Sequence, residues 1–63
     1  MKYTTTVNTY HVEKYLADGT CSDCGRLQKE DVRRMLRGYQ YDADFDMYFS
    51  KGANIGYAIE EAE

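Results

Sequence analysis

Apolar residues recur with helical spacing in the middle of the chain. Val32, Met35, Leu36 and Tyr39 stand at positions i, i+3, i+4 and i+7, which places their side chains on one face of an α-helix. Acidic residues precede the arginines in this stretch, as the helix dipole favours, and a glycine follows it as a natural stop. The pattern predicts a helix over residues 28–37 with one apolar face.

The C-terminal third alternates with the period of a β-strand. Over residues 44–50, phenylalanine and methionine occupy alternate positions, the pattern of a strand with one buried face. Residues 55–60 repeat the alternation, with large apolar side chains set against mostly small ones. Between them, residues 51–54 read Lys-Gly-Ala-Asn, and Gly and Asn tolerate the positive φ of a tight turn. This third is predicted to form a β-hairpin.

The N-terminal third also favours extended structure. Residues 3–7 are rich in threonine, which is typical of strands, and Tyr10, Val12 and Leu16 share one strand face. The large residues within 3–7 have the opposite parity. A continuous strand therefore requires a β-bulge near residues 8–9.

A turn at residues 17–20, Ala-Asp-Gly-Thr, leads into a predicted return strand over 21–27. The alternative makes residues 9–18 a short helix that stops at Gly19. The strand is favoured because the first four of these residues, Thr-Tyr-His-Val, are poor helix formers. The resulting order, β-β-α-β-β, predicts an α+β fold: a small antiparallel sheet of about four strands with one helix packed on one face. The other face is the expected binding surface.

The size of the chain limits its chemistry. Its 63 residues are expected to form a single domain, 1–63, which buries about 60% of the surface of the unfolded chain and leaves little room for a deep active site. The motifs of a nucleophile elbow, a P-loop and a zinc protease are missing from the sequence. There is also no apolar leader and no run of about 18 apolar residues. We therefore predict a non-enzymatic cytoplasmic protein that binds another macromolecule.

Charge is distributed unevenly along the chain. Residues 1–38 carry seven basic and five acidic side chains, a net of +2, whereas residues 39–63 carry one basic and six acidic side chains, a net of −5. The two parts sum to the overall charge of −3. The acidic part predicts a partner with a basic, nucleic-acid-binding surface, held by contacts that weaken in salt.

Three aspartates, Asp42, Asp44 and Asp46, stand at alternate positions in this acidic part. An EF-hand loop needs Gly and Glu where Met47 and Ala53 stand, so the sequence excludes that site. On one face of a strand the carboxylates would repeat every 6.6–6.8 Å or so, the scale of neighbouring phosphates in a nucleic acid. The stripe predicts imitation of nucleic acid. The alternatives are solubilising charges that protect a sheet edge and a weak metal site.

Tyrosines flank the aspartates, and the predicted hairpin could bring glutamates beside them. Tyr is favoured at recognition surfaces because its ring is rigid and amphipathic. In size, acidity and tyrosine content the chain is similar in type to inhibitors encoded by phages and mobile elements, including anti-CRISPR and anti-restriction proteins. The predicted partner-binding residues are Tyr39, Tyr41, Asp42, Asp44, Asp46, Tyr48, Glu60 and Glu61, with Glu63 as a further acidic group.

Cys21 and Cys24 form a C-x-x-C motif, and His11 is the one further residue that suits zinc. One chain supplies at most three such ligands, so a zinc site would need four cysteines shared by a homodimer. In a regular strand the two thiols would point to opposite faces, and a redox pair normally begins at a helix N-terminus. We expect ordinary small side chains here, an ordinary surface histidine at position 11, and no cofactor.

The arginines offer a third hypothesis, direct nucleic-acid binding. Arg33, Arg34 and Arg37 lie on the polar side of the predicted helix, and Arg26 precedes it. Against this stand the net negative charge and an isoelectric point near 5.0. Glu30 is also placed to pair with an arginine four residues later.

Overall fold

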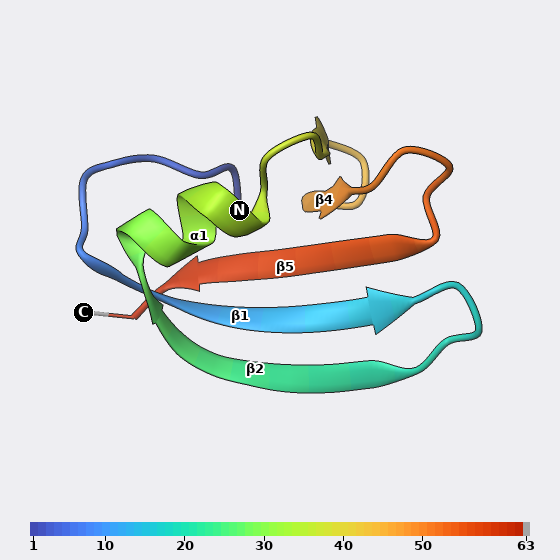
Figure 1. Ribbon diagram of the computed structural model, residues 1–63, viewed down its shortest axis with the longest axis horizontal. Coiled ribbons are helices and arrows are strands. Elements are labelled where there is room, and N and C mark those ends of the chain that lie inside the picture. Colours follow the sequence, from blue (N-terminus) through green and yellow to red (C-terminus); the bar gives the residue numbers. More distant parts are fainter. Residues whose placement is uncertain (63) are drawn as a thin grey trace.

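A computed structural model of the chain describes residues 1–62, which form a sheet and one short helix (Figure 1). The sequence order is β-β-α-β-β-β, so the predicted α+β class is confirmed, with one strand more than expected. The additional strand is β3, which directly follows the helix region. The elements are β1 (Thr9–Leu16), β2 (Cys21–Gln28), α1 (Lys29–Met35), β3 (Gln40–Asp42), β4 (Met47–Phe49) and β5 (Ile55–Glu61).

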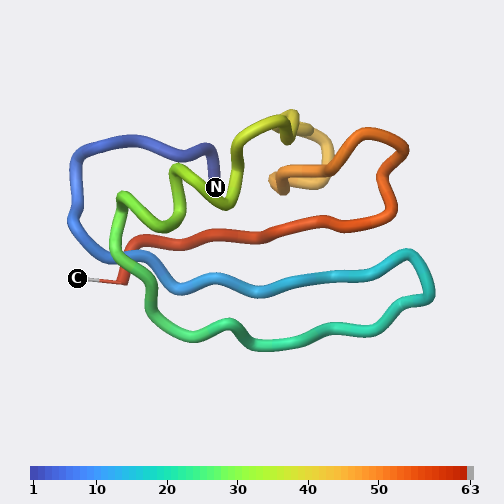
Figure 2. Tube along the Cα trace, in the orientation of Figure 1, coloured from blue at the N-terminus to red at the C-terminus, as the bar shows by residue number. Residues whose placement is uncertain are grey.

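The sheet has the strand order β2-β1-β5-β4-β3, and each neighbouring pair is antiparallel. The two longest ladders join β1 to β2 and β1 to β5, which places β1 and β5 in the middle (Figures 1 and 2). The strands β3 and β4 form a short extension beyond β5. The sheet therefore has two different edges, a long one at β2 and a short one at β3.

The core lies between the sheet and α1. Tyr10 and Val12 of β1 and Ile59 of β5 are fully buried, and they pack with Val32 and Leu36 from the helix region. Val12 pairs directly with Ile59, so alternate residues of these strands point towards the helix. The buried Tyr10 hydroxyl is satisfied by the Thr4 carbonyl, to which it donates a hydrogen bond.

The helix is shorter than the sequence predicted. It covers Lys29–Met35, with Gln28 as an N-cap whose side chain makes no capping bond. The apolar stripe is confirmed for Val32 and Leu36, which are buried, whereas Met35 is half-buried. Gly38, with φ of 82°, takes the left-handed conformation expected just beyond the helix. Tyr39, the last residue of the predicted stripe, lies outside α1.

The predicted strand over residues 9–16 is confirmed and its helical alternative is wrong. The turn at 17–20 is also confirmed, closed by a bond from the Leu16 amide to the Thr20 carbonyl at 2.9 Å. The predicted strand over 3–7 is wrong, because this segment crosses the helix side of the sheet instead. Its anchors include the Tyr3 hydroxyl, which donates to the Lys29 carbonyl at 3.1 Å.

Because residues 3–7 do not extend β1, no β-bulge is required near residues 8–9. The bulge of this sheet lies in β2. The pairing of β1 with β2 shifts between Val12 and Glu13, where Val12 faces Gly25 and Glu13 faces Asp23. Cys24 is the extra residue of this bulge. Gly25 beside it has φ of 75°, a conformation that suits glycine.

The C-terminal hairpin is confirmed at its turn, where the Ala53 amide donates to the Ser50 carbonyl at 2.8 Å. Its first strand is shorter than the predicted 44–50 and covers Met47–Phe49 only. The preceding residues form a turn back to β3, the strand that the sequence analysis missed. Among the described residues, no helix is both long enough and apolar enough to cross a membrane.

Candidate partner-binding site

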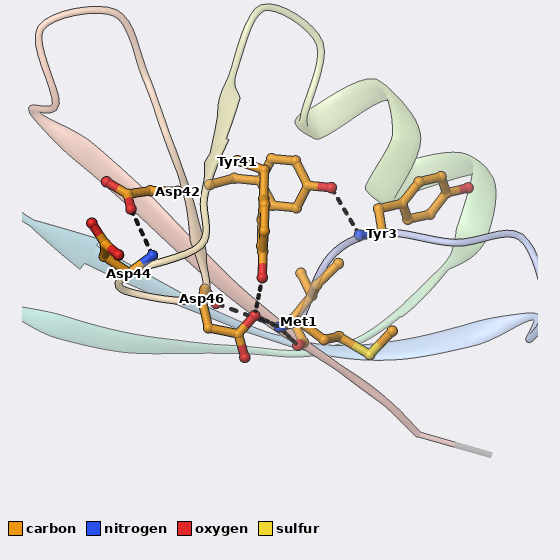
Figure 3. A network of polar contacts seen from close by, with 8 residues as sticks. Met1, Tyr3, Tyr41, Asp42, Asp44 and Asp46 are labelled. Atoms are coloured by element: carbon orange, nitrogen blue, oxygen red, sulfur yellow. Dashed lines mark hydrogen bonds and ion pairs between the residues drawn. The ribbon is translucent and has the colours of Figure 1, made fainter.

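The connection between β3 and β4, residues 42–46, is an acidic turn fastened by its own side chains. The Asp42 carboxylate accepts a hydrogen bond from the Asp44 amide at 2.9 Å, which closes its first half. The Tyr41 hydroxyl donates to Asp46 Oδ1 at 2.5 Å and so joins its two ends (Figure 3). Asp46 has φ of 56°, a left-handed conformation that Asp tolerates better than most residues. These bonds give the acidic turn a defined shape.

Asp46 is committed to holding this turn in place. Its carboxylate lies 3.3 Å from the Met1 ammonium, which also donates to the Ile59 carbonyl at 2.8 Å (Figure 3). The hydrogen bond from Tyr41 and then the ammonium group lower the pKa of Asp46 below its ordinary value. The same hydrogen bond raises the pKa of Tyr41. The carboxylate that remains most available to a partner is the exposed one of Asp44.

The predicted stripe of aspartates on one strand face is wrong. Asp42 ends β3, whereas Asp44 and Asp46 belong to the turn. The strand was predicted from alternation alone, and an Asx turn at Asp42 competes with extended structure at this point. The even spacing that would have resembled phosphates depended on that strand.

The apolar residues of β4 lie on the face of the sheet that the helix does not cover. Tyr48 pairs with Tyr57, which has the same parity as the buried Ile59, so Tyr48 points towards the helix. Phe49 must therefore point to the opposite face, where its ring covers Gly56. The sequence predicted the reverse for β4, because an alternating pattern does not indicate which set of residues is buried.

Phe45 is the most exposed large apolar residue of the acidic turn, with 67% of its surface accessible. Its ring packs edge-on against Phe49, with the centroids 5.6 Å apart. The two rings border an open groove of about 960 Å³. The groove is further lined by β3 and by residues 51–53 of the hairpin turn. The alternation over residues 44–50 placed Phe45 on a buried strand face, and the sequence holds no separate signal of its exposure.

The three tyrosines of the predicted site take part in packing. Tyr41 packs against Tyr48 with the rings tilted and their centroids 5.2 Å apart, and Tyr39 packs against Tyr57 in the same way at 5.4 Å. All four rings are half-buried. Burial raises the pKa of Tyr39 above its ordinary value. Of these tyrosines, Tyr41 binds the acidic turn directly through Asp46, whereas the most accessible ring of the turn is that of Phe45.

Glu60 and Glu61 lie at the end of β5, beyond its short ladder with β4. Both side chains are exposed, and neighbouring residues of a strand point to opposite faces. Glu60 pairs with His11, whereas the Glu61 carboxylate accepts a hydrogen bond from the Thr6 hydroxyl at 3.3 Å. The Met1 ammonium contacts both Asp46 and the Ile59 carbonyl, so one end of the acidic turn lies near the residue that precedes Glu60. Glu63 lies outside the described residues.

The candidate zinc ligands are not brought together within one chain. Cys21 and Cys24 are exposed free thiols on β2, and the bulge at Cys24 overturns the regular strand parity assumed from the sequence. His11 Nε2 lies 2.8 Å from Asp23 Oδ1 instead of facing the thiols. Across residues 1–62, no three His, Cys, Asp or Glu side chains are grouped closely enough to hold a metal ion. The shared site of a homodimer stays a prediction.

The helix arginines are exposed, as the sequence predicted for its polar side. Arg34 pairs with Asp31, three residues before it, and not with Glu30, the predicted partner. Arg33 and Arg37 flank this pair on the same surface. The acidic neighbours reduce the positive charge that this surface offers to a phosphate backbone.

Comparison of the chain with protein-family models, with curated proteins and with solved structures gives no significant match.

Proposed function

We propose that this chain is a non-enzymatic protein-binding module and that the acidic turn, with Phe45 as its anchor, is its contact surface. The observation that carries the proposal is an exposed aromatic ring at a fixed position between carboxylates. Ordered aromatic side chains at a surface are typical binding hot spots, because they bury a large area with little loss of conformational freedom.

The charge of the acidic part favours a partner with a basic surface. Residues 39–63 carry a net charge of −5, and the exposed Asp44 directly precedes Phe45 in the chain. Such a pair of surfaces associates faster at low salt, because long-range attraction steers the encounter. The proposed cellular role is that of a cytoplasmic inhibitor of phage or mobile-element type that covers a basic, nucleic-acid-binding surface.

Imitation of nucleic acid by evenly spaced carboxylates is not part of the proposed contact. Asp46 is engaged by Tyr41, and Asp42 is engaged by the backbone of the turn. An apolar anchor with flanking charge is a different mode of recognition, in which the aromatic contact supplies much of the affinity and the charges supply specificity.

A tagged pull-down from lysate of the source cells, at low and high salt, tests this proposal. Phe45→Ser removes the anchor, and Leu16→Ser is the matched control, because Leu16 is the other large apolar residue that is substantially exposed, at 38%. Circular dichroism first confirms that both variants fold. We expect a stoichiometric partner with the native chain and with Leu16→Ser, lost at high salt.

The Phe45→Ser variant should retain that partner about tenfold less well or worse, as expected for loss of a hot spot. Equal recovery with both variants would contradict the proposal, because the contact would then lie elsewhere. A partner that resists high salt would contradict the electrostatic part alone.

A further inference from the structure

The groove beside Phe45 and Phe49 adjoins a strand that is open on one side. Within residues 1–62, β3 stands at the end of the sheet and pairs with β4 alone. Alternate residues of a strand direct their backbone groups to the same edge, so one or two residues of β3 offer theirs on the side away from β4. An exposed strand edge of this kind can accept an extended segment of another chain as an additional strand.

The side chains around the groove specify what that segment must carry. Residues 40 and 42 have the same parity as Phe49, so both Gln40 and Asp42 border the groove on the side of β3. The rings of Phe45 and Phe49 supply its apolar part. Lys51, in the hairpin turn that follows β4, borders it beyond Phe49. The groove thus combines a carboxylate at one end, aromatic rings along it and an ammonium group at the other end.

We propose that β3 is an acceptor edge for one extended peptide segment of the partner protein. In this segment a basic, an apolar and an acidic residue occupy alternate positions. The basic side chain pairs with Asp42 Oδ2, since Oδ1 accepts the bond from the Asp44 amide. The apolar side chain packs on Phe45 and Phe49, and the acidic one pairs with Lys51. Backbone hydrogen bonds to β3 supply affinity that does not depend on sequence, and the three side chains supply specificity. This inference rests on the proposed protein-binding function and names its ligand.

The other edge of the sheet is a poor acceptor, which is why β3 is assigned this role. The bulge at Cys24 breaks the regular spacing of β2, and Gly25 has a positive φ there. Bulges increase the local twist and are a common protection of edge strands against pairing. In β3 the positive-φ residues lie outside the strand, at Gly38 and Asp46.

Titration of the ¹⁵N-labelled chain with a synthetic peptide tests the inference. The probe is a capped heptapeptide of threonines in which lysine, leucine and glutamate occupy alternate positions two, four and six. We expect shifts of the amide resonances of Gln40, Tyr41 and Asp42, saturating below about 5 mM. Resonances of β2 should not move.

A second peptide carries N-methyl groups on alternate amides, which removes the hydrogen bonds of one strand edge and keeps all three side chains. It should bind at least about tenfold more weakly than the first, since the peptide amides no longer donate to the free edge of β3. Two such peptides are compared, one methylated at the odd-numbered and one at the even-numbered amides. Only one of these two sets faces β3, and which one depends on the direction of the peptide strand. A third peptide, with leucine moved to position three, places its apolar side chain on the wrong face and should also bind more weakly.

Three results would overturn the inference. They are no shift of β3 amides at the highest concentration, equal binding of both methylated peptides and the parent, and shifts of β3 amides on dilution of the chain without peptide. The last would mean that a second copy occupies the edge. None of these results affects the pull-down with Phe45→Ser, so failure of the peptide mode and failure of the protein-binding function are distinguishable.

Discussion

The two edge strands of the sheet, β2 and β3, lie at opposite sides of the molecule and protect their free edges differently (Figure 1). The β2 edge has eight residues, and a bulge at Cys24 interrupts it. The β3 edge has three residues, no bulge and an aromatic groove beside it. The longer edge offers more backbone groups but in an irregular arrangement. A short edge strand is less prone to pairing than a long one, so β3 is distinguished by its regularity and by the aromatic side chains beside it.

The largest change in stability is expected from substitution of Gly56, a residue of β5 against which the side chains of β4 pack. A Cβ at this position would lie 2.9 Å from both Met47 Cε and Phe49 Cε1. Gly56→Val should therefore displace the floor of the groove and destabilise the chain by about 3 kcal/mol, the upper end of typical overpacking costs. Denaturant unfolding measures the loss, and hydrogen exchange should show faster opening of β3 and β4 than of β2.

A glycine on the β2 side provides the matched substitution. Gly25 has φ of 75°, and a Cβ there would meet nothing within 4 Å. Gly25→Ala should cost about 1 kcal/mol through backbone conformation alone. Its faster hydrogen exchange should be confined to β2 and the adjoining part of β1. Equal loosening of both edges by either variant would show that the edges are not independent.

A smaller effect is expected from the carboxylates that fasten each edge. The pKa of Asp23 on β2 is lowered by hydrogen bonds from the Gly25 amide and from His11, and that of Asp46 is lowered chiefly by Tyr41. A folded-state pKa below the unfolded value means that the stabilisation is present above about pH 4 and is lost as pH falls through the folded-state value.

NMR titration of the two side chains in acid checks this directly. Protonation of Asp46 should shift the resonances of the acidic turn, and protonation of Asp23 should shift those of β2. Asp46→Asn should remove the acid-dependent change at the turn while the change at β2 persists. An Asp46 that titrates at its ordinary value would contradict the hydrogen bond from Tyr41 in solution.

The smallest effect is expected from the thiols. Cys21 and Cys24 are both exposed, so their joint replacement by serine should change stability by less than about 0.5 kcal/mol. Protein purified without chelator should contain under about 0.2 zinc per chain by elemental analysis. Stoichiometric zinc, together with a dimer that the double variant loses, would make β2 the interface and reverse the comparison of the two edges.

The parts of the fold that the sequence predicted are those with local causes. The stripe of Val32 and Leu36 indicated the helix, and the glycines of the turns at 17–20 and 51–54 indicated both hairpins. The strand β3 was missed because three residues, Gln-Tyr-Asp, are too few for a period to be visible. The threonines of residues 3–7 favour extension and so predict a strand. The position of this segment is instead set by distant contacts such as that of Tyr3 with Lys29.

For the candidate site, the sequence indicated the location of the acidic turn but not the orientation of its residues. Tyr and Phe both satisfy a strand pattern, and here the tyrosines point towards the helix while Phe49 covers the open face. Phe45 then becomes the exposed ring because the chain reverses direction around it. An alternating pattern determines which residues share a face, but only the assembled sheet determines which face is covered.

The central ladder has a consequence for the order of folding. β1 pairs with β5, whose residues lie 39 to 51 positions later in the chain than their partners in β1. The Tyr3 amide likewise donates to the hydroxyl of the distant Tyr48. During synthesis the β1–β2 hairpin and α1 emerge first, but the second edge of β1 stays unpaired until β5 leaves the ribosome. Contacts of such long sequence separation slow folding, since the chain must close a large loop before they stabilise it. We therefore expect the acidic turn to acquire its shape last, in one step with the closure of the sheet.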